Sequence, residues 1–136
     1  MNETEKSTLM QAAEAARLLS YSPYSHFCVG AALLGKSGKI YTGCNIENAA
    51  YTPTNCAERT AFFKAVSEGE REFTAIAITG GREGDAPSFC APCGVCRQVM
   101  AEFCDGDFAI LLGNSQGLTE MTLAELLPER FGPHSL

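Results

Sequence analysis

The chain has 136 residues, of which 46% are hydrophobic and 19% are charged, and its formal net charge is −6. This length and composition are typical of one globular domain with a buried core, and they exclude a disordered chain. The acidic balance argues against a nucleic acid polymer as partner and leaves small molecules open.

The N-terminus, the longest apolar run and the cysteines indicate the cellular compartment of such a protein. Residues 1–7 are polar and no apolar segment follows them, so we expect no signal peptide. The longest nearly apolar run, residues 27–35, is too short to cross a bilayer. We therefore expect a soluble cytoplasmic protein without a membrane partner, in which the seven cysteines are thiols or metal ligands rather than disulfides.

The first third of the chain predicts a helix followed by a hairpin. Residues 3–20 have one apolar face at helical spacing, and Pro23 would end that helix. Two strand-like runs, 27–34 and 39–44, flank a predicted turn at 36–38. The residues of the apolar helix face are Leu9, Ala12, Ala13, Ala16 and Leu19.

The remaining elements alternate between helices and strands. A loop over 45–55 leads to a helix from Cys56 to about Glu68, with Asn55 or Thr54 as its cap and Gly69 ending it. The expected order after it is strand 73–79, loop 80–92, helix 93–104, strand 108–112, turn 116–117, helix 122–127 and an irregular tail 128–136.

This alternation predicts an α/β fold with a parallel or mixed sheet and helices on its faces. The helices that begin near positions 56 and 93 each follow a strand. Their N-termini should therefore lie at the carboxyl ends of strands, where open α/β sheets bind ligands.

Three cysteines stand at these two helix starts: Cys56, Cys93 and Cys96. A helix N-terminus lowers the pKa of a thiol, which favours a metal site or a reactive site over inert packing. Three protein ligands would leave one position of a tetrahedral zinc ion open, as in catalytic sites. Cys90 adds two alternatives, a closed four-thiolate zinc site and an iron–sulfur cluster, although the fourth cysteine of the cluster motif would fall at Met100.

Glu58 and Arg59 follow the first cysteine directly. Glu58 is a candidate for moving protons beside an activated water, or it is only an acid that favours the helix N-terminus. Arg59 lies three residues after Cys56, on the same helix face, where it could withdraw charge from the ligand sulfurs. The alternative for Arg59 is a surface ion pair with Glu58 or Glu68.

The run Cys56-Ala57-Glu58 followed by Pro92-Cys93-Gly94-Val95-Cys96 resembles the signature of zinc-dependent cytidine deaminases. Residues 24–32 (YSHFCVGAA), residues 43–51 (GCNIENAAY), Arg97-Gln98 and Leu126-Leu127-Pro128 are similar to the same family, so the likeness covers nearly the whole chain. The all-cysteine ligand set and the short length resemble the small, homotetrameric branch.

The resemblance implies a three-layer α/β/α sandwich with a central mixed sheet of about five strands, in a single catalytic domain over 1–136. It implies hydrolytic deamination of cytidine and 2′-deoxycytidine, with one zinc ion held by the three cysteines. Glu58 would take a proton from the attacking water, protonate N3 of the pyrimidine and help ammonia leave. The sequence leaves two other functions open, a deaminase of another aminopyrimidine nucleoside and a non-catalytic, zinc-stabilised binding module.

The resemblance also implies a set of residues that bind the substrate. Asn45 and Glu47 would bind the ribose hydroxyls, the Ala57 backbone would contact the base, and Phe27 would pack on its ring. Phe131 would reach the site of a neighbouring subunit, and Arg59 would bond to the ligand sulfurs. The full substrate-binding set is Phe27, Asn45, Ile46, Glu47, Asn48, Ala49, Ala50, Tyr51, Ala57 and Phe131.

The residue types alone give weaker evidence for these substrate-binding roles than the resemblance does. An amide and a carboxylate two positions apart can grip vicinal hydroxyls, but both are also ordinary turn residues. Phe27 begins an apolar run, so core packing is its default role. The two histidines, His26 and His134, lack the spacing of ligands.

Overall fold

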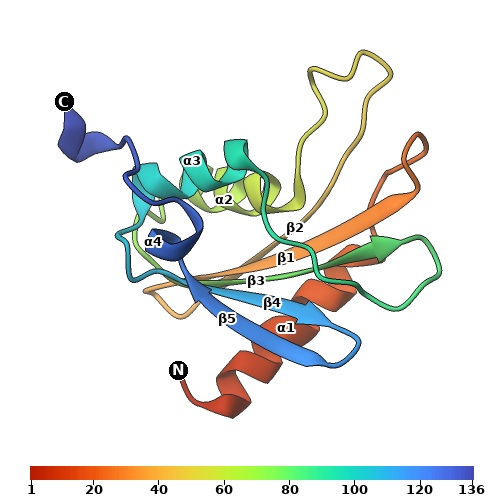
Figure 1. Ribbon diagram of the computed structural model, residues 1–136, viewed down its shortest axis with the longest axis horizontal. Coiled ribbons are helices and arrows are strands. Elements are labelled where there is room, and N and C mark those ends of the chain that lie inside the picture. Colours follow the sequence, from red (N-terminus) through yellow and green to blue (C-terminus); the bar gives the residue numbers. More distant parts are fainter.

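The computed structural model describes residues 1–136, and a single five-stranded sheet runs through it (Figure 1). The strands are β1 (Phe27–Gly35), β2 (Ile40–Cys44), β3 (Phe73–Arg82), β4 (Ala109–Asn114) and β5 (Gly117–Thr122). The helices are α1 (Glu3–Arg17), α2 (Ala57–Ser67), α3 (Gly94–Phe103) and α4 (Leu123–Leu126), with a 3₁₀ turn at Pro133–Ser135.

The strand order is β2-β1-β3-β4-β5, with β3 and β4 parallel and the other three neighbouring pairs antiparallel. The mixed sheet predicted from the sequence is therefore confirmed. None of the helices combines the length and the apolar character needed to cross a membrane.

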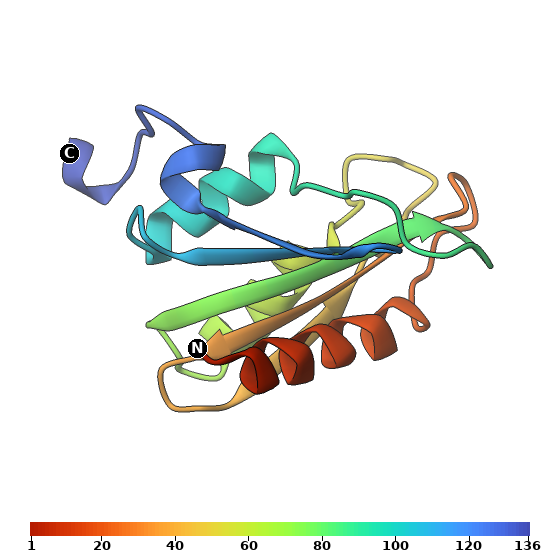
Figure 2. The same ribbon diagram turned by 60° about the horizontal axis from the view of Figure 1, so that its bottom comes forward.

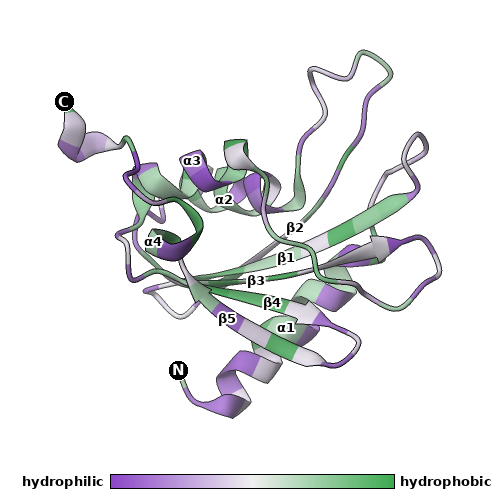
Figure 3. Ribbon diagram, in the orientation of Figure 1, coloured by the Kyte–Doolittle hydropathy of each residue, from purple (hydrophilic) through white to green (hydrophobic).

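Helices cover both faces of the sheet, as the three-layer prediction requires (Figure 2). Alternate residues of a strand point to opposite faces, and β3 divides its apolar side chains in this way. Ala75 and Ala77 pack with α1, whereas Ile76 and Ile78 pack with α2, α3 and α4. Figure 3 shows that hydrophobic residues concentrate on the central strands, while α1 alternates between hydrophobic and hydrophilic positions.

Two glycines allow helices to approach the sheet backbone closely. A Cβ at Gly30 of β1 would lie 2.1 Å from the carbonyl oxygen of Ala13 in α1. On the other face, a Cβ at Gly43 of β2 would lie 2.5 Å from the carbonyl oxygen of Ala57. Only glycine fits at such distances, and Gly43 thereby seats the first turn of α2 directly on the sheet.

The direction of the strands brings the starts of α2 and α3 together. Strands β2 and β3 both run antiparallel to β1, so their carboxyl ends lie at the same edge of the sheet. Helix α2 follows β2 through the loop 45–55, and α3 follows β3 through the loop 83–93. Their N-termini meet at the edge where open α/β sheets bind ligands.

Helix α1 ends three residues earlier than the sequence predicts. After Arg17 the backbone tightens, since the N–H of Leu18 donates to Ala15 and that of Leu19 donates to Ala16. The Leu19 side chain is 77% exposed, so its predicted place on the buried helix face was wrong. The Arg17 guanidinium donates to the carbonyl oxygens of Cys28 and Arg82, which ties the end of α1 to β1 and to the end of β3.

The predicted cap of α2 was also wrong. Cys56, not Asn55 or Thr54, occupies the N-cap position, and it makes no side-chain capping hydrogen bond. The Asn55 amide donates instead to the Thr60 hydroxyl, at 3.1 Å. The thiol at the start of α2 therefore has no structural task within its own helix. The predicted helix end is confirmed, because Gly69 adopts φ +101° directly after the C-cap Glu68.

Candidate active site

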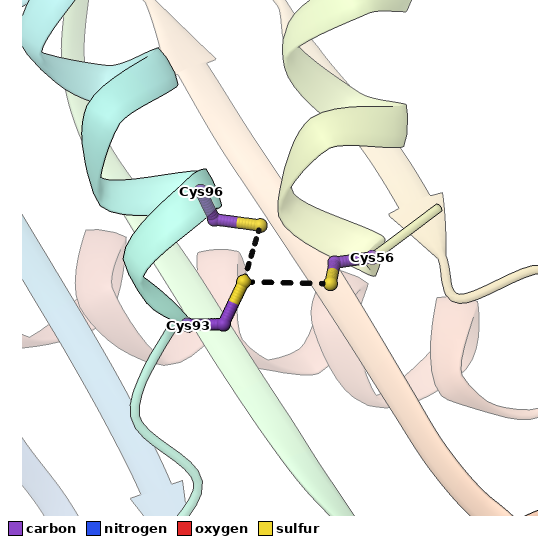
Figure 4. Close-up of side chains that lie close together, drawn as sticks. All are labelled: Cys56, Cys93 and Cys96. Atoms are coloured by element: carbon purple, nitrogen blue, oxygen red, sulfur yellow. Dashed lines mark hydrogen bonds between the residues drawn. The ribbon is translucent and has the colours of Figure 1, made fainter. Parts of the chain in front are cut away.

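The three predicted metal ligands lie together at the starts of α2 and α3 (Figure 4). The Sγ atoms of Cys56 and Cys93 are 3.7 Å apart, those of Cys93 and Cys96 are 3.6 Å apart, and all three lie within 4.8 Å of one another. A tetrahedral zinc ion with Zn–S bonds of about 2.3 Å separates its sulfurs by about 3.8 Å. This spacing and the soft donor set fit zinc.

The local structure leaves these thiols free to bind a metal. Cys56 and Cys93 are the N-caps of their helices, and neither side chain caps its own helix. Cys96 lies one turn into α3, where Figure 4 shows its sulfur turned toward the other two. Both helix N-termini carry partial positive charge that favours thiolates. The three thiols are therefore placed so that together they could hold a metal ion.

Arg59 lies against this cluster rather than on the surface. Its Nη2 donates to the Cys56 sulfur at 3.3 Å, and no ion pair joins it to Glu58 or Glu68. The neighbouring Cys96 thiol and the Arg59 guanidinium lower the pKa of the Cys56 thiol to about 5. The nearby Cys56 sulfur, together with burial, raises the pKa of the Cys96 thiol.

Glu58 is a buried carboxyl group without a partner. Its side chain is in the first turn of α2, the residue is 4% exposed, and Oε1 has no hydrogen-bond partner within the chain. Burial raises the pKa of Glu58 to about 7, so this group can gain and lose a proton near neutral pH. A helix N-terminal acid that only favoured the dipole would be exposed, so burial points to a chemical role.

Cys90 does not belong to the cluster of three sulfurs. It lies in the loop between β3 and α3, and a Cβ built on Gly80 would be 2.9 Å from its sulfur. Burial raises the pKa of the Cys90 thiol to about 11, which makes it a poor thiolate. The geometry thus favours the open three-ligand site over the closed four-ligand alternative.

Replacing Cys90 by serine is therefore expected to leave the zinc content at about one ion per chain. The measurement is metal analysis of the purified variant beside the unaltered protein. A variant without zinc would show instead that four thiolates close the site.

The loop after β2 holds the two residues predicted to bind the sugar. The Oδ1 of Asn45 accepts hydrogen bonds from the Ser20 hydroxyl (2.5 Å) and from the Val29 N–H (2.9 Å). Its Nδ2 donates to the carbonyl oxygen of Phe27 at 2.8 Å. An amide nitrogen has two N–H groups, so one donor of Asn45 is left for a ligand.

The Glu47 carboxylate is fixed by the segment before β1. Its Oε1 accepts from the N–H groups of Tyr24 (2.9 Å) and Ser25 (3.1 Å), and its Oε2 accepts from the Ser25 hydroxyl. Glu47 and Ser25 line an open hollow of about 410 Å³, to which Tyr24 and Tyr51 also contribute. The rings of these two tyrosines meet edge to face with their centroids 6.4 Å apart.

The other predicted substrate contacts occupy varied positions. Phe27 is half-buried at the start of β1, and Ala57 is fully buried at the start of α2. Tyr51 has φ +59° and is 73% exposed at the far end of the loop. Phe131 is 60% exposed in the tail, where its carbonyl oxygen accepts from the Gln98 amide at 2.9 Å. The remaining loop residues are mostly exposed: Ile46, Asn48, Ala49 and Ala50.

A larger hollow, of about 560 Å³, lies elsewhere. The end of α3 and the C-terminal tail line it, and none of the three clustered cysteines contributes to it. It holds neither the clustered thiols nor the buried carboxyl group, so we do not assign the chemistry to this larger space.

Ser20 and Ser25 make contacts that the sequence does not predict. Each hydroxyl binds the side chain of a predicted sugar-binding residue, Asn45 or Glu47, across more than twenty positions of the chain. No spacing in the sequence relates the two segments, which are joined by the pairing of Tyr21 with Ile46.

Comparison with known proteins agrees with this site. Residues 3–112 match the family model described as the cytidine and deoxycytidylate deaminase zinc-binding region. The chain is 54% identical over 129 residues to the cytidine deaminase of Sporosarcina psychrophila, covering 94% of this chain and 92% of that protein. It is 52% identical over 128 residues to the cytidine deaminase of Halalkalibacterium halodurans, covering 93% and 94%. The crystal structure of cytidine deaminase from Burkholderia pseudomallei superposes with a TM-score of 0.84 at 46% identity, covering 96% of this chain and all of that one.

Proposed function

The chain belongs to the cytidine and deoxycytidylate deaminase family, and we propose that it hydrolyses cytidine and 2′-deoxycytidine to the corresponding uridines and ammonia. The observation that carries this proposal is the buried, unpartnered carboxyl group of Glu58 beside three clustered thiols. Relatives named cytidine deaminase match more than nine tenths of the chain. That match favours this function over a deaminase of another aminopyrimidine and over a non-catalytic zinc module.

Cys56, Cys93 and Cys96 would hold the zinc ion, which when bound supplies an activated water for attack at the pyrimidine carbon that bears the amino group. Arg59 donates to the Cys56 sulfur and so draws charge away from the ligand set. Three thiolates on one divalent ion carry a net charge near −1. The guanidinium offsets part of this charge, so that the bound metal could still lower the pKa of its water.

Glu58 would carry the protons of the reaction. Its free Oε1 can accept a proton from the attacking water and then give it to N3 of the ring. A second transfer through the same carboxyl group would move the remaining proton of that water to the departing amino group, which leaves as ammonia while its carbon keeps the oxygen. The burial that raises the pKa of Glu58 makes both the charged and the neutral form accessible.

Asn45 and Glu47 would bind the ribose. Asn45 keeps one free N–H, whereas the Glu47 carboxylate only accepts. A hydroxyl group can accept from the first and donate to the second, so the pair suits a sugar. We assign the base to Phe27 and the Ala57 backbone, and we assign the rest of the loop through Tyr51 to enclosing the substrate.

We also propose that residues 1–136 act as one domain within a cytoplasmic homotetramer. The aromatic rings of Phe131 and Tyr51 are largely exposed in the isolated chain, as expected of side chains that a neighbouring subunit covers. Every cysteine is free, in keeping with a reducing compartment.

The test is the loss of cytidine absorbance on adding the purified protein, with and without a chelator, together with metal analysis. We expect rapid loss that the chelator abolishes, with about one zinc ion per chain. Zinc-loaded protein that leaves cytidine unchanged would contradict the proposal, and other aminopyrimidines would then be screened.

A further inference from the structure

We propose that Ser25 is a positioning residue for sugar recognition, which holds the Glu47 carboxylate so that one acceptor site faces the substrate. This inference rests on the proposed function and deepens it, because it names the group that sets the geometry of the sugar contact. The resemblance of residues 24–32 to the family assigns Ser25 no role.

The contacts of Glu47 leave little freedom to its side chain. Two backbone N–H groups, from Tyr24 and Ser25, bind Oε1, and the Ser25 hydroxyl binds Oε2. A carboxylate offers about four acceptor sites, so these three bonds leave roughly one, and it is on Oε2. Ser25 supplies two of the three bonds, one from its backbone and one from its side chain.

The Ser25 hydroxyl also ties the loop to the strand that carries Phe27. While it donates to Glu47, it accepts from the Phe27 N–H at 3.0 Å. Between them, His26 adopts φ +57°, a left-handed conformation that folds the backbone so that position 27 returns to position 25. One hydroxyl thus joins a predicted sugar contact to a predicted base contact.

The surroundings of Glu47 favour a ligand that donates a hydrogen bond. The hydrogen bond from Ser25 lowers the pKa of Glu47 from its ordinary value, and the two backbone bonds act in the same direction. The group is therefore an ionised acceptor at neutral pH and must meet a donor. Its hollow of about 410 Å³ is open, so a substrate hydroxyl can reach it.

The chain contains a matched control for this arrangement. In the turn between β1 and β2, the Ser37 hydroxyl accepts from the Lys39 N–H at 3.3 Å and donates to the Glu70 carboxylate. The pattern is the same as at Ser25: serine, the N–H two residues later, and a distant glutamate. Ser37 lies at the opposite end of the strands from the clustered cysteines. Loss of its hydrogen bonds can therefore change the stability of the protein but not the binding of substrate.

The experiment compares Ser25→Ala with Ser37→Ala in steady-state kinetics on cytidine and in calorimetric binding of uridine. For Ser25→Ala we expect KM and the uridine Kd to rise roughly 10- to 150-fold, the usual weight of a hydrogen bond to a charged group, while kcat changes much less. Ser37→Ala should change none of these values, and Ser25→Thr, which keeps the hydroxyl, should restore affinity. Thermal unfolding of the two alanine variants controls for loss of structure.

Two further measurements separate positioning from packing. On 2′-deoxy and 3′-deoxy analogues of cytidine, Ser25→Ala should no longer raise KM for the analogue that lacks the hydroxyl bound by Glu47. The double variant Ser25→Ala/Glu47→Ala should bind uridine no more weakly than Glu47→Ala alone, because Ser25 acts through Glu47. An equal rise in KM on every analogue would overturn the inference. So would losses of uridine affinity that add in the double variant.

The outcomes also distinguish this inference from the proposed function. Normal turnover with unchanged KM and Kd in Ser25→Ala would overturn the role of Ser25 and leave the deaminase function intact. Uridine binding that depends on Ser25, in a protein that does not deaminate cytidine, would support the sugar site and overturn the deaminase function. Absence of both turnover and nucleoside binding in the unaltered protein would overturn both.

Discussion

Replacing Glu58 by glutamine is expected to lower kcat on cytidine by roughly 10³-fold, within the range that general acid–base catalysis contributes. Glutamine has the same size and fits the buried space, but its amide cannot carry a proton between water and the ring. The three cysteines are untouched, so the zinc content and the thermal midpoint should stay close to those of the unaltered protein. The measurements are kcat, metal analysis and thermal unfolding on the same preparation.

A matched control for this substitution lies at the other end of the same helix. Glu68 is the C-cap of α2 and pairs on the surface with Lys39, at 2.7 Å. Glu68→Gln makes the same chemical change at the far end of the helix, and an exposed ion pair of this kind contributes at most about 1 kcal/mol. It should leave kcat unchanged. If Glu58→Gln turned over cytidine as fast as Glu68→Gln does, Glu58 could not be the proton carrier.

Much of the fold could be predicted because its core elements carry strong local signals. The buried strands β3 and β4 are apolar on both faces, and Cys56 and the pair Cys93-x-x-Cys96 mark helix starts next to loops rich in turn residues. Strand β5 lacks such a signal. Gly117–Thr122 is mostly exposed and pairs only with β4 at the edge of the sheet, so its sequence shows no buried face. Its position is set by pairing with β4, and the local sequence of residues 117–122 does not reveal that pairing.

The site divides in the same way. The spacing Cys93-x-x-Cys96 and a third cysteine at another helix start predict a metal site, and the structure brings the three sulfurs together. The orientation of Glu58 could not follow from its distance of two residues from Cys56. It results from the packing of α2 against the sheet at Gly43, which buries the first turn of the helix. The contacts of Ser20 and Ser25 likewise arise only when two distant loops pair.

Replacing Cys96 by serine is expected to abolish both zinc binding and turnover. Cys96 is 1% exposed, so a solvent molecule cannot take the place of its sulfur, and a serine hydroxyl is a far weaker zinc ligand than a thiolate. Losing a ligand should reduce zinc affinity by more than the roughly 100-fold that loss of an outer partner costs. The control is Cys104→Ser at the other end of α3, because burial raises the pKa of that thiol to about 12 and it lies outside the cluster.

The decisive readout for Cys96→Ser is thermal unfolding with and without added zinc, because it does not depend on turnover. A ligand that binds only the folded state at 100 times its Kd stabilises that state by about 2.7 kcal/mol. Added zinc should therefore raise the midpoint of the metal-stripped unaltered protein and of stripped Cys104→Ser, but not that of Cys96→Ser. An equal rise in all three proteins would place the metal away from Cys96. Together with Glu58→Gln, which should keep the metal and lose turnover, this result separates the residues that hold zinc from the residue that moves protons beside it.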